Sequence, residues 1–196
     1  SNTQLNDPKR GFSFNFDGPL DMRMDNINTK LTAETIINEY DEKELSDIFF
    51  YYGEEKNSRK IANSIVKFRK KKKIESTKML SDIVQKINKY KFKHPATRVF
   101  QALRIVINEE LNELEEALKI SLEILTKNAR IVIVCFHSLE DKIIKNFFKK
   151  NSYKNVHDDK KNFFRIITKK PITPSPEEIK INPRSKSAKL RVAEKI

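Results

Sequence analysis

The sequence predicts an α/β protein that contains a large helical segment, and three observations lead to this fold class. A β-branched apolar run at residues 129–136 is followed at once by an amphipathic segment, which is the pattern of a strand, a turn and a helix. Residues 31–91 and 97–126 instead repeat their apolar side chains every three or four positions, as helices do. Hydrophobic residues make up 38% of the chain and charged residues 34%, a mixture typical of helix-rich soluble proteins.

The first 31 residues are predicted to form an ordered functional loop. They contain no sustained apolar period, and many of them are aspartate or asparagine. Glycine or proline interrupts the segment at Pro8, Gly11, Gly18 and Pro19. Such punctuation favours tight turns over a helix or a long strand.

Four helices are expected between residues 31 and 91. The first is expected to begin after Thr32, its N-cap, and to end near Tyr40, and the second is expected from Asp41 to Gly53. The third is expected from Glu54 to about Lys72, and the fourth after the capping pair Ser76 and Thr77. Residues 34–55 hold eight acids and one lysine, whereas residues 56–73 hold nine basic residues and no acid. This polarity indicates either a surface that faces a polyanion or a solvated lysine-rich face.

One long helix is expected from about Thr97 to Thr126. Its apolar residues follow the spacing 3-4-4-3-4-4-3, and they are Phe100, Leu103, Ile107, Leu111, Leu114, Leu118, Leu122 and Leu125. Polar side chains on its other side, at Arg98, Gln101, Arg104 and Asn108, could hold the N-terminal loop.

The strands are expected after this helix. Ala129–Phe136 predicts a strand that is buried on both faces of a largely parallel sheet, and a helix from Ser138 to about Asn151 follows it. Phe163–Thr168 and Lys189–Ala193 predict an antiparallel pair at the sheet edge.

Charge and cysteine usage narrow the function classes. A net charge of +13 and a pI near 9.7 favour a polyanionic partner, although AT-rich genomes also raise the lysine count. The single cysteine, Cys135, lies inside the apolar run and is predicted to be inert. The longest such run, Ile131–Phe136, is too short to cross a bilayer, and Ser1–Gln4 lacks the apolar core of a signal peptide. We therefore expect a cytoplasmic protein with no membrane partner.

Two segments are candidates for chemistry. Asp17–Asp25 packs three acids and an arginine around Gly18 and Pro19, which fits an active-site loop as well as a structural one. Phe136–Asp141 follows the predicted strand, and ligands bind at that edge of open α/β sheets. The structural alternative there is a capping box of Ser138 and Asp141, with His137 bound to a backbone group.

Two more segments carry weaker signals. His94–Arg98 could simply begin the long helix. Asn182–Ser187 is a basic, hydroxyl-rich turn that either contacts phosphate or is a plain turn with no binding role. The sequence has no Gly-rich phosphate loop and no nucleophile elbow. Its three histidines are too scattered to predict a metal site.

Together these segments resemble one family, the MraW-like ribosomal RNA small subunit methyltransferases H, which modify the N4 amine of a cytosine in 16S rRNA. The matching stretches are Gln4–Phe14, Asp17–Asp25, Tyr52–Glu55, His94–Arg98, Gln101–Ile105, Phe136–Asp141 and Asn182–Lys195. Two departures are small: residues 127–129 replace a usual Pro-Gly-Gly turn, and Cys135 stands where serine is common.

The resemblance implies a Rossmann-like methyltransferase sheet with an inserted helical subdomain. Residues 1–30 and 92–196 would belong to the C-terminal part of the methyltransferase domain, and residues 31–91 would form the substrate-recognition insert. It also implies S-adenosyl-L-methionine as cofactor and a decoding-centre cytosine of 16S rRNA, in the small ribosomal subunit, as substrate. A homodimer is compatible with the sequence.

The resemblance implies roles for individual residues. Asp17 or Asp21 would accept a hydrogen bond from the cytosine N4 amine, His137 would line the base pocket, and Gln4 is the one position that matches a cofactor contact. Residues expected to orient the loop or contact RNA are Arg23, Arg98, Lys70, Lys71, Lys72, Arg184 and Ser185.

The family's Gly-rich cofactor turn, its ribose-binding acid and the aspartate that ends its fourth strand are expected before Ser1. We therefore expect an N-terminally truncated enzyme that is inactive alone. The first alternative is a non-catalytic rRNA-binding fragment. The second is an N4-cytosine DNA methyltransferase, which the matching segments disfavour.

Overall fold

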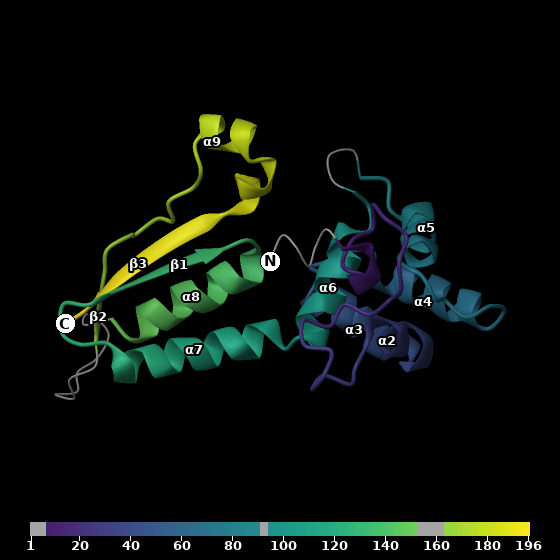
Figure 1. Ribbon diagram of the computed structural model, residues 1–196, viewed down its shortest axis with the longest axis horizontal. Helices are drawn as coiled ribbons and strands as arrows, with labels where there is room; N and C mark the ends of the chain where they lie inside the picture. The colour runs from purple at the N-terminus through teal and green to yellow at the C-terminus, as the bar shows by residue number, and fades with distance from the viewer. Residues whose placement is uncertain (1–6, 91–93, 153–162) are drawn as a thin grey trace. The chain divides into compact units, whose positions relative to one another are not determined.

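The computed structural model describes residues 7–90, 94–152 and 163–196 (Figure 1). The chain divides into two compact units, Ser1–Glu110 and Leu111–Ile196, and each is described by itself. Among the described residues, no helix is both long and apolar enough to cross a membrane.

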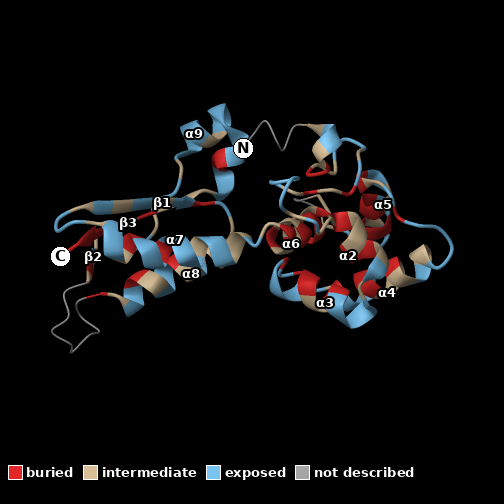
Figure 2. Ribbon diagram, turned by 60° about the horizontal axis from the view of Figure 1, so that its bottom comes forward, coloured by how far each residue is buried: buried red, intermediate tan, exposed pale blue. Residues whose placement is uncertain are grey.

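Unit 1 is helical and encloses one hydrophobic core (Figure 2). Its elements are a 3-10 turn η1 (Pro8–Arg10) and the helices α2 (Ala33–Glu39), α3 (Glu42–Tyr51), α4 (Ser58–Arg69), α5 (Thr77–Ile87) and α6 (Thr97–Ile107). Phe12, Leu20 and Met22 from the N-terminal loop are buried in the same core as the helices. The loop and the helices are therefore one packed body, and the division between the compact units lies at Glu110.

The predicted helix starts are confirmed at three N-caps. Thr32 Oγ1 accepts the N–H of Thr35, and Ser76 Oγ accepts the N–H of Met79. Asp41 and Glu44 form a reciprocal capping box at the start of α3. In each case a side-chain oxygen pairs a first-turn N–H group that has no partner inside the helix.

The predicted helix over residues 54–72 is shorter than expected, because α4 covers only Ser58–Arg69. The chain leaves the helix after Arg69, whose guanidinium donates to the carbonyl oxygens of Ile37 (2.7 Å) and Tyr40 (2.5 Å). Lys70–Lys73 therefore lie in the exposed turn that follows the helix.

The prediction of one helix from Thr97 to Thr126 is wrong. The chain forms α6 (Thr97–Ile107) and α7 (Glu110–Ile124), with a break at Asn108 and Glu109. Glu109 has a left-handed φ of 48°, which ends a right-handed helix. The Asn108 amide, beside it, is hydrogen-bonded to the N-terminal loop, so a tertiary contact breaks the helix although the apolar period continues.

Unit 2 packs helices against a three-stranded sheet of order β1-β3-β2 (Figure 1). Its elements are α7, β1 (Arg130–Cys135), α8 (Ser138–Lys150), β2 (Phe164–Ile166), α9 (Pro176–Ile181), a 3-10 turn η3 (Pro183–Ser187) and β3 (Lys189–Lys195). The predicted antiparallel pairing of β2 with β3 is confirmed, with Arg165 opposite Glu194. Its core includes Leu118, Ile144, Phe148 and Phe164.

The prediction that β1 is buried on both faces of a parallel sheet does not hold among the described residues. β1 pairs antiparallel with β3, with Val132 opposite Val192. Ile131, Ile133 and Cys135 face the core, but Val132 and Val134 are 57% and 49% exposed. The strand has two apolar faces, and the described residues cover only one of them.

Candidate functional site

The candidate site in unit 1 is the loop Asp17–Asp25. This loop packs closely against the segment around Pro8 and Gly11, and two glycines make the close contact possible. Gly11 has a left-handed φ of 71°, and an added Cβ would lie 2.0 Å from the carbonyl oxygen of Pro19. An added Cβ on Gly18 would lie 2.0 Å from the carbonyl oxygen of Pro8. The two segments touch backbone to backbone, so neither glycine position accepts a side chain.

The N-terminus of α5 holds the start of this loop. The hydroxyl of Thr77 donates to the carbonyl of Phe16 (2.9 Å) and accepts the N–H of Gly18 (3.1 Å). The N–H of Thr77 donates to the carbonyl of Gly18 (2.9 Å), and that of Lys78 donates to Asp17 Oδ1 (3.2 Å). A carboxylate is stabilised here because a helix N-terminus carries partial positive charge.

Asp17 is an exposed, ionised acceptor. Hydrogen bonds from the Ser76 side chain and from the Lys78 backbone lower the pKa of its carboxyl below the usual value. The carboxylate therefore keeps lone pairs available on the solvent side. Phe16, its neighbour, has a ring that is 56% exposed. An exposed aromatic residue and an exposed hydrogen-bond acceptor are thus consecutive in the loop.

Asp21 is engaged by its neighbour Arg23 in a bidentate ion pair. Arg23 Nε lies 2.7 Å from Oδ1 of Asp21, and Nη2 lies 2.8 Å from Oδ2. The same guanidinium donates to the carbonyl of Thr29 (2.9 Å). The hydrogen bond from Arg23 lowers the pKa of Asp21. Asp21 and Arg23 therefore fix the shape of the loop, which is one of the two roles that the sequence allowed for Arg23.

Asn108 and Arg10 clamp the second half of the loop. The amide of Asn108 donates to the carbonyl of Met22 (2.8 Å) and accepts the N–H of Met24 (2.6 Å). Arg10 Nη2 donates to the carbonyls of Arg23 (2.8 Å) and Met24 (2.9 Å). Met22 adopts a left-handed φ of 63° with its side chain fully buried. These contacts leave the loop little freedom.

A buried carboxylate, Glu55, organises a second motif, and the sequence predicted no role for it although Tyr52–Glu55 matches the family. Its Oε1 accepts the hydroxyl of Tyr90 (2.7 Å) and the N–H of Asn57 (2.8 Å), and its Oε2 accepts the amide of Asn88 (3.0 Å). Asn88 also donates to the carbonyl of Pro95 (3.2 Å). The available signal was the acidic pair that directly follows Gly53.

Arg98 and the start of α6 belong to this second motif. The Arg98 guanidinium lies 5.5 Å from the centre of the Tyr90 ring, a cation–π contact. An added Cβ on Gly53 would lie 2.6 Å from the Arg98 carbonyl, so this glycine permits the close approach of α6. The His94 ring stacks on Phe14 with centroids 4.1 Å apart, and burial lowers its pKa. Of the four polar residues predicted to hold the N-terminal loop, Asn108 is the one whose described hydrogen bonds reach it.

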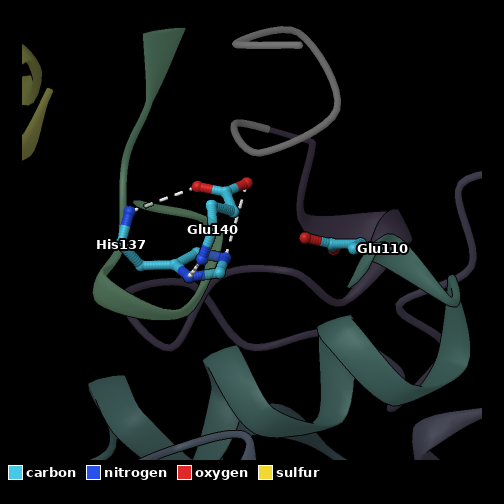
Figure 3. Close-up of side chains that lie close together, drawn as sticks. All are labelled: Glu110, His137 and Glu140. Atoms are coloured by element: carbon cyan, nitrogen blue, oxygen red, sulfur yellow. Dashed lines mark hydrogen bonds and ion pairs between the residues drawn. The ribbon is translucent and has the colours of Figure 1, made fainter. Parts of the chain in front are cut away.

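In unit 2 the N-cap of α8 is His137, one residue before the predicted cap (Figure 3). The predicted capping box of Ser138 and Asp141 is wrong, because the box is formed by His137 and Glu140. Nδ1 of His137 accepts the N–H of Glu140 (3.3 Å), and Glu140 Oε2 accepts the N–H of His137 (3.2 Å). A neutral ring then carries its proton on Nε2. Glu110, also drawn, pairs with Arg104 in unit 1 (2.7 Å).

Asp141 ties α8 to β3. Its Oδ1 accepts from Nε of Arg191 (2.6 Å), and its Oδ2 accepts from Nζ of Lys189 (3.0 Å). The side chains of Arg191 and Asp141 are largely buried, whereas that of Lys189 is partly exposed, and the hydrogen bond from Arg191 lowers the pKa of Asp141. Asp141 is therefore a structural anchor of the strand–helix unit.

The remaining predicted site residues are three exposed lysines, two residues of η3, and Gln4, which was predicted to contact the cofactor. Lys70, Lys71 and Lys72 are exposed after α4, and Arg184 is exposed in η3. Ser185 is buried, and its hydroxyl donates to the carbonyl of Asn182 (2.7 Å). Gln4 lies outside the described residues. Asp17, Asp21 and Arg23 belong to unit 1, whereas His137, Arg184 and Ser185 belong to unit 2.

Comparison with known proteins places these motifs in one family. A model of the MraW methylase family matches residues 1–196, the entire chain. The chain belongs to the MraW methylase family. Its relatives include ribosomal RNA small subunit methyltransferase H of Sulfurihydrogenibium sp. strain YO3AOP1, 54% identical over 96% of this chain and 63% of that protein. Those of Carboxydothermus hydrogenoformans and Rickettsia typhi are 48% and 49% identical over all of this chain and 66% and 67% of their own lengths.

The chain thus spans about two thirds of the length of these MraW relatives. Within the described part, its glycines do not form a cofactor cradle, because Gly11, Gly18 and Gly53 each pack against a backbone carbonyl of the chain itself. Among the described residues, these glycines therefore do not supply the backbone contacts of a Gly-rich cofactor turn.

Proposed function

We propose that this chain is part of an S-adenosyl-L-methionine-dependent enzyme that methylates the N4 amine of a decoding-centre cytosine in 16S rRNA, within the small ribosomal subunit. The observation that carries the proposal is the family match over all 196 residues, together with 48–54% identity to proteins named ribosomal RNA small subunit methyltransferase H. Methylation of a base amine needs a rigidly held hydrogen-bond acceptor beside the accessible base, and the loop Asp17–Asp25 supplies such an acceptor in Asp17.

Asp17 is the residue to which we assign contact with the target amine. The N4 lone pair of cytosine is delocalised into the ring, so the amine is a weak nucleophile. An ionised acceptor that binds an N4–H favours the pyramidal nitrogen, whose lone pair is available for attack. Asp17 is exposed and ionised, whereas both oxygens of Asp21 are bound by Arg23. Asp21 and Arg23 then act as positioning residues.

The exposed ring of Phe16 supports binding of an unstacked base beside Asp17. An enzyme that acts on a base amine must take the base out of its stack, and aromatic side chains replace the lost stacking. We assign His137 to the base pocket only through its strand-end position, because its Nδ1 already caps α8.

The basic turn after α4 is the proposed contact with the rRNA backbone. Lys70, Lys71 and Lys72 are exposed and adjacent, and residues 56–73 contain no acid. Each neutralised phosphate releases counterions, so replacing these three lysines by glutamine is expected to weaken binding and to lower the salt slope by about 2. An unchanged slope would mean that the turn is only solvated surface. Arg184 in η3 is a further proposed phosphate contact.

The fold that we propose for the whole enzyme is a Rossmann-like sheet with a helical insert at residues 31–91. Its support is β1, which lies at one end of the described strand order and exposes an apolar face at Val132 and Val134. A further strand and a covering layer would bury that edge and that face.

Cofactor binding and methyl transfer test the proposal together. The 196-residue chain and a version extended by the upstream reading frame are compared by calorimetry with S-adenosyl-L-methionine, and then by methyl transfer to small ribosomal subunits. We expect the extended protein to bind and methylate and the short chain to do neither. If the extension adds neither property while the short chain binds rRNA, the chain is a non-catalytic RNA-binding module.

A further inference from the structure

We propose that a groove between the C-terminal end of α3 and the first turn of α4 binds a single-stranded segment of RNA. This inference rests on the proposed function and names where unit 1 holds the strand. The groove has a volume of about 390 Å³, which is in the range of pockets that enclose small ligands. It is formed within unit 1 and is separate from the loop Asp17–Asp25.

Two exposed aromatic rings form one side of the groove. Phe50 and Tyr51 are 54% and 63% exposed, although Phe49, the preceding residue of α3, is fully buried in the core. The two rings meet edge to face with centroids 5.2 Å apart. The two rings lie outside the hydrophobic core of unit 1, and they offer faces on which unpaired bases stack. A duplex hides its base faces, so this feature favours a single strand.

Three cations line the other side. They are Lys56 before α4 and Arg59 and Lys60 in its first turn, which has no acidic residue. Within the described residues, none of the three forms an ion pair. Asp47 is the one acid in the lining, and Lys43 pairs with it at 3.3 Å. The groove therefore has an excess of positive charge beside its aromatic rings, the combination that follows a phosphate backbone while bases stack.

The floor of the groove is fixed by buried polar contacts. The hydroxyls of Ser46 and Ser58 lie 3.3 Å apart beneath it. Asn57 is held by Glu55 and by the side chain of Asn88 (2.8 Å). A preformed groove costs less ordering when it binds a flexible strand. The buried Glu55 motif thus supports a binding surface.

The test measures RNA binding by the 196-residue chain with fluorescence anisotropy. The probes are a fluorescein-labelled 12-nucleotide single-stranded RNA and the same sequence annealed to its complement. Phe50→Leu/Tyr51→Leu keeps an apolar side chain at both positions but removes both rings, and it is expected to weaken single-strand binding about ten- to hundredfold. Duplex affinity should change less than about twofold. Ile27→Ala, at an 88% exposed apolar side chain elsewhere in unit 1, is the matched control and should bind like the wild type.

A second variant separates charge from stacking. Arg59→Gln/Lys60→Gln should lower the slope of log affinity against log salt by about 1.4, whereas Phe50→Leu/Tyr51→Leu should leave the slope unchanged. Equal urea midpoints for all variants show that they are folded. Undiminished single-strand affinity in Phe50→Leu/Tyr51→Leu, or no RNA binding by the wild type, overturns the groove.

The outcome is independent of the methyl-transfer test. If the extended protein transfers methyl groups normally and Phe50→Leu/Tyr51→Leu binds single-stranded RNA like the wild type, the groove proposal is rejected and the proposed function is kept. If RNA binding depends on the two rings but the extended protein transfers no methyl group, the groove proposal is supported and the proposed enzymatic function is rejected.

Discussion

The guanidinium of Arg23 binds both carboxylate oxygens of Asp21, at 2.7 and 2.8 Å. This ion pair distinguishes Asp21 from Asp17, two acids to which the sequence assigns the same possible role. Asp21 has its oxygens committed inside the loop, whereas Asp17 presents its carboxylate at the surface. The loop therefore combines one structural acid with one accessible acid.

Asp21→Asn is expected to destabilise unit 1 by about 1–2 kcal/mol at pH 7, because the amide cannot form the bidentate ion pair. The folded-state pKa of Asp21 is lowered from 3.8, so the contribution of the pair is present above that value and is lost as the pH falls through the folded pKa. Urea unfolding of wild type and variant at pH 7 and pH 3 measures this. A difference in stability that stays constant with pH would contradict the assignment.

Glu55→Gln is expected to lower the free energy of unfolding by about 1–3 kcal/mol, although glutamine has the same shape as glutamate. Glu55 accepts from Tyr90, Asn57 and Asn88 with both of its oxygens. In either orientation, the new amide would place its NH₂ group against the N–H of Asn57 or the amide of Asn88. Urea unfolding measures the loss, and Tyr90→Phe, which removes one donor, is the milder control. Full stability in Glu55→Gln would mean that the network is not held by the carboxylate.

Asp141→Asn is expected to destabilise unit 2 by about 3 kcal/mol, because it leaves Arg191 buried without its carboxylate. The pKa of Asp141 is lowered from 3.8 by Arg191, so the loss is full at neutral pH and disappears in acid below the folded pKa. Hydrogen exchange of the β3 amides follows unit 2 directly. Unchanged protection in the variant would contradict the role of Asp141 as an anchor.

Cys135 is expected to react slowly with thiol reagents. It is 2% exposed, and burial raises the pKa of its thiol to about 11. Roughly one thiol in a thousand is then ionised at pH 8, and only the thiolate reacts. Absorbance during reaction with a disulfide reagent should show slow labelling in buffer and rapid labelling in urea. Rapid labelling of the folded chain would show that Cys135 is accessible.

The local elements were predictable because their causes are local. Thr32, Asp41 and Ser76 cap helices through contacts within four residues, and a continuous β-branched apolar run marks β1. The break at Asn108 was not predictable, since the apolar spacing runs through it and the cause is a contact with Met22 and Met24, more than 80 residues away.

The candidate site was predictable in its location and not in its division of roles. The sequence marked the loop Asp17–Asp25 but could not distinguish Asp17 from Asp21, because the difference depends on where Arg23 and the N-terminus of α5 lie. The role of Glu55 was missed because its partners, Asn88 and Tyr90, are distant in the chain.

Methyl transfer by Asp17→Ala tests the central claim most directly. In the protein extended by the upstream reading frame, turnover on small ribosomal subunits should fall at least about 100-fold while the cofactor Kd stays unchanged. Asp25→Ala, an exposed acid of the same loop that bonds to Asn28, is the matched control and should keep its turnover within about threefold. Wild-type turnover in Asp17→Ala would contradict the assignment of Asp17 as the acceptor of the cytosine amine.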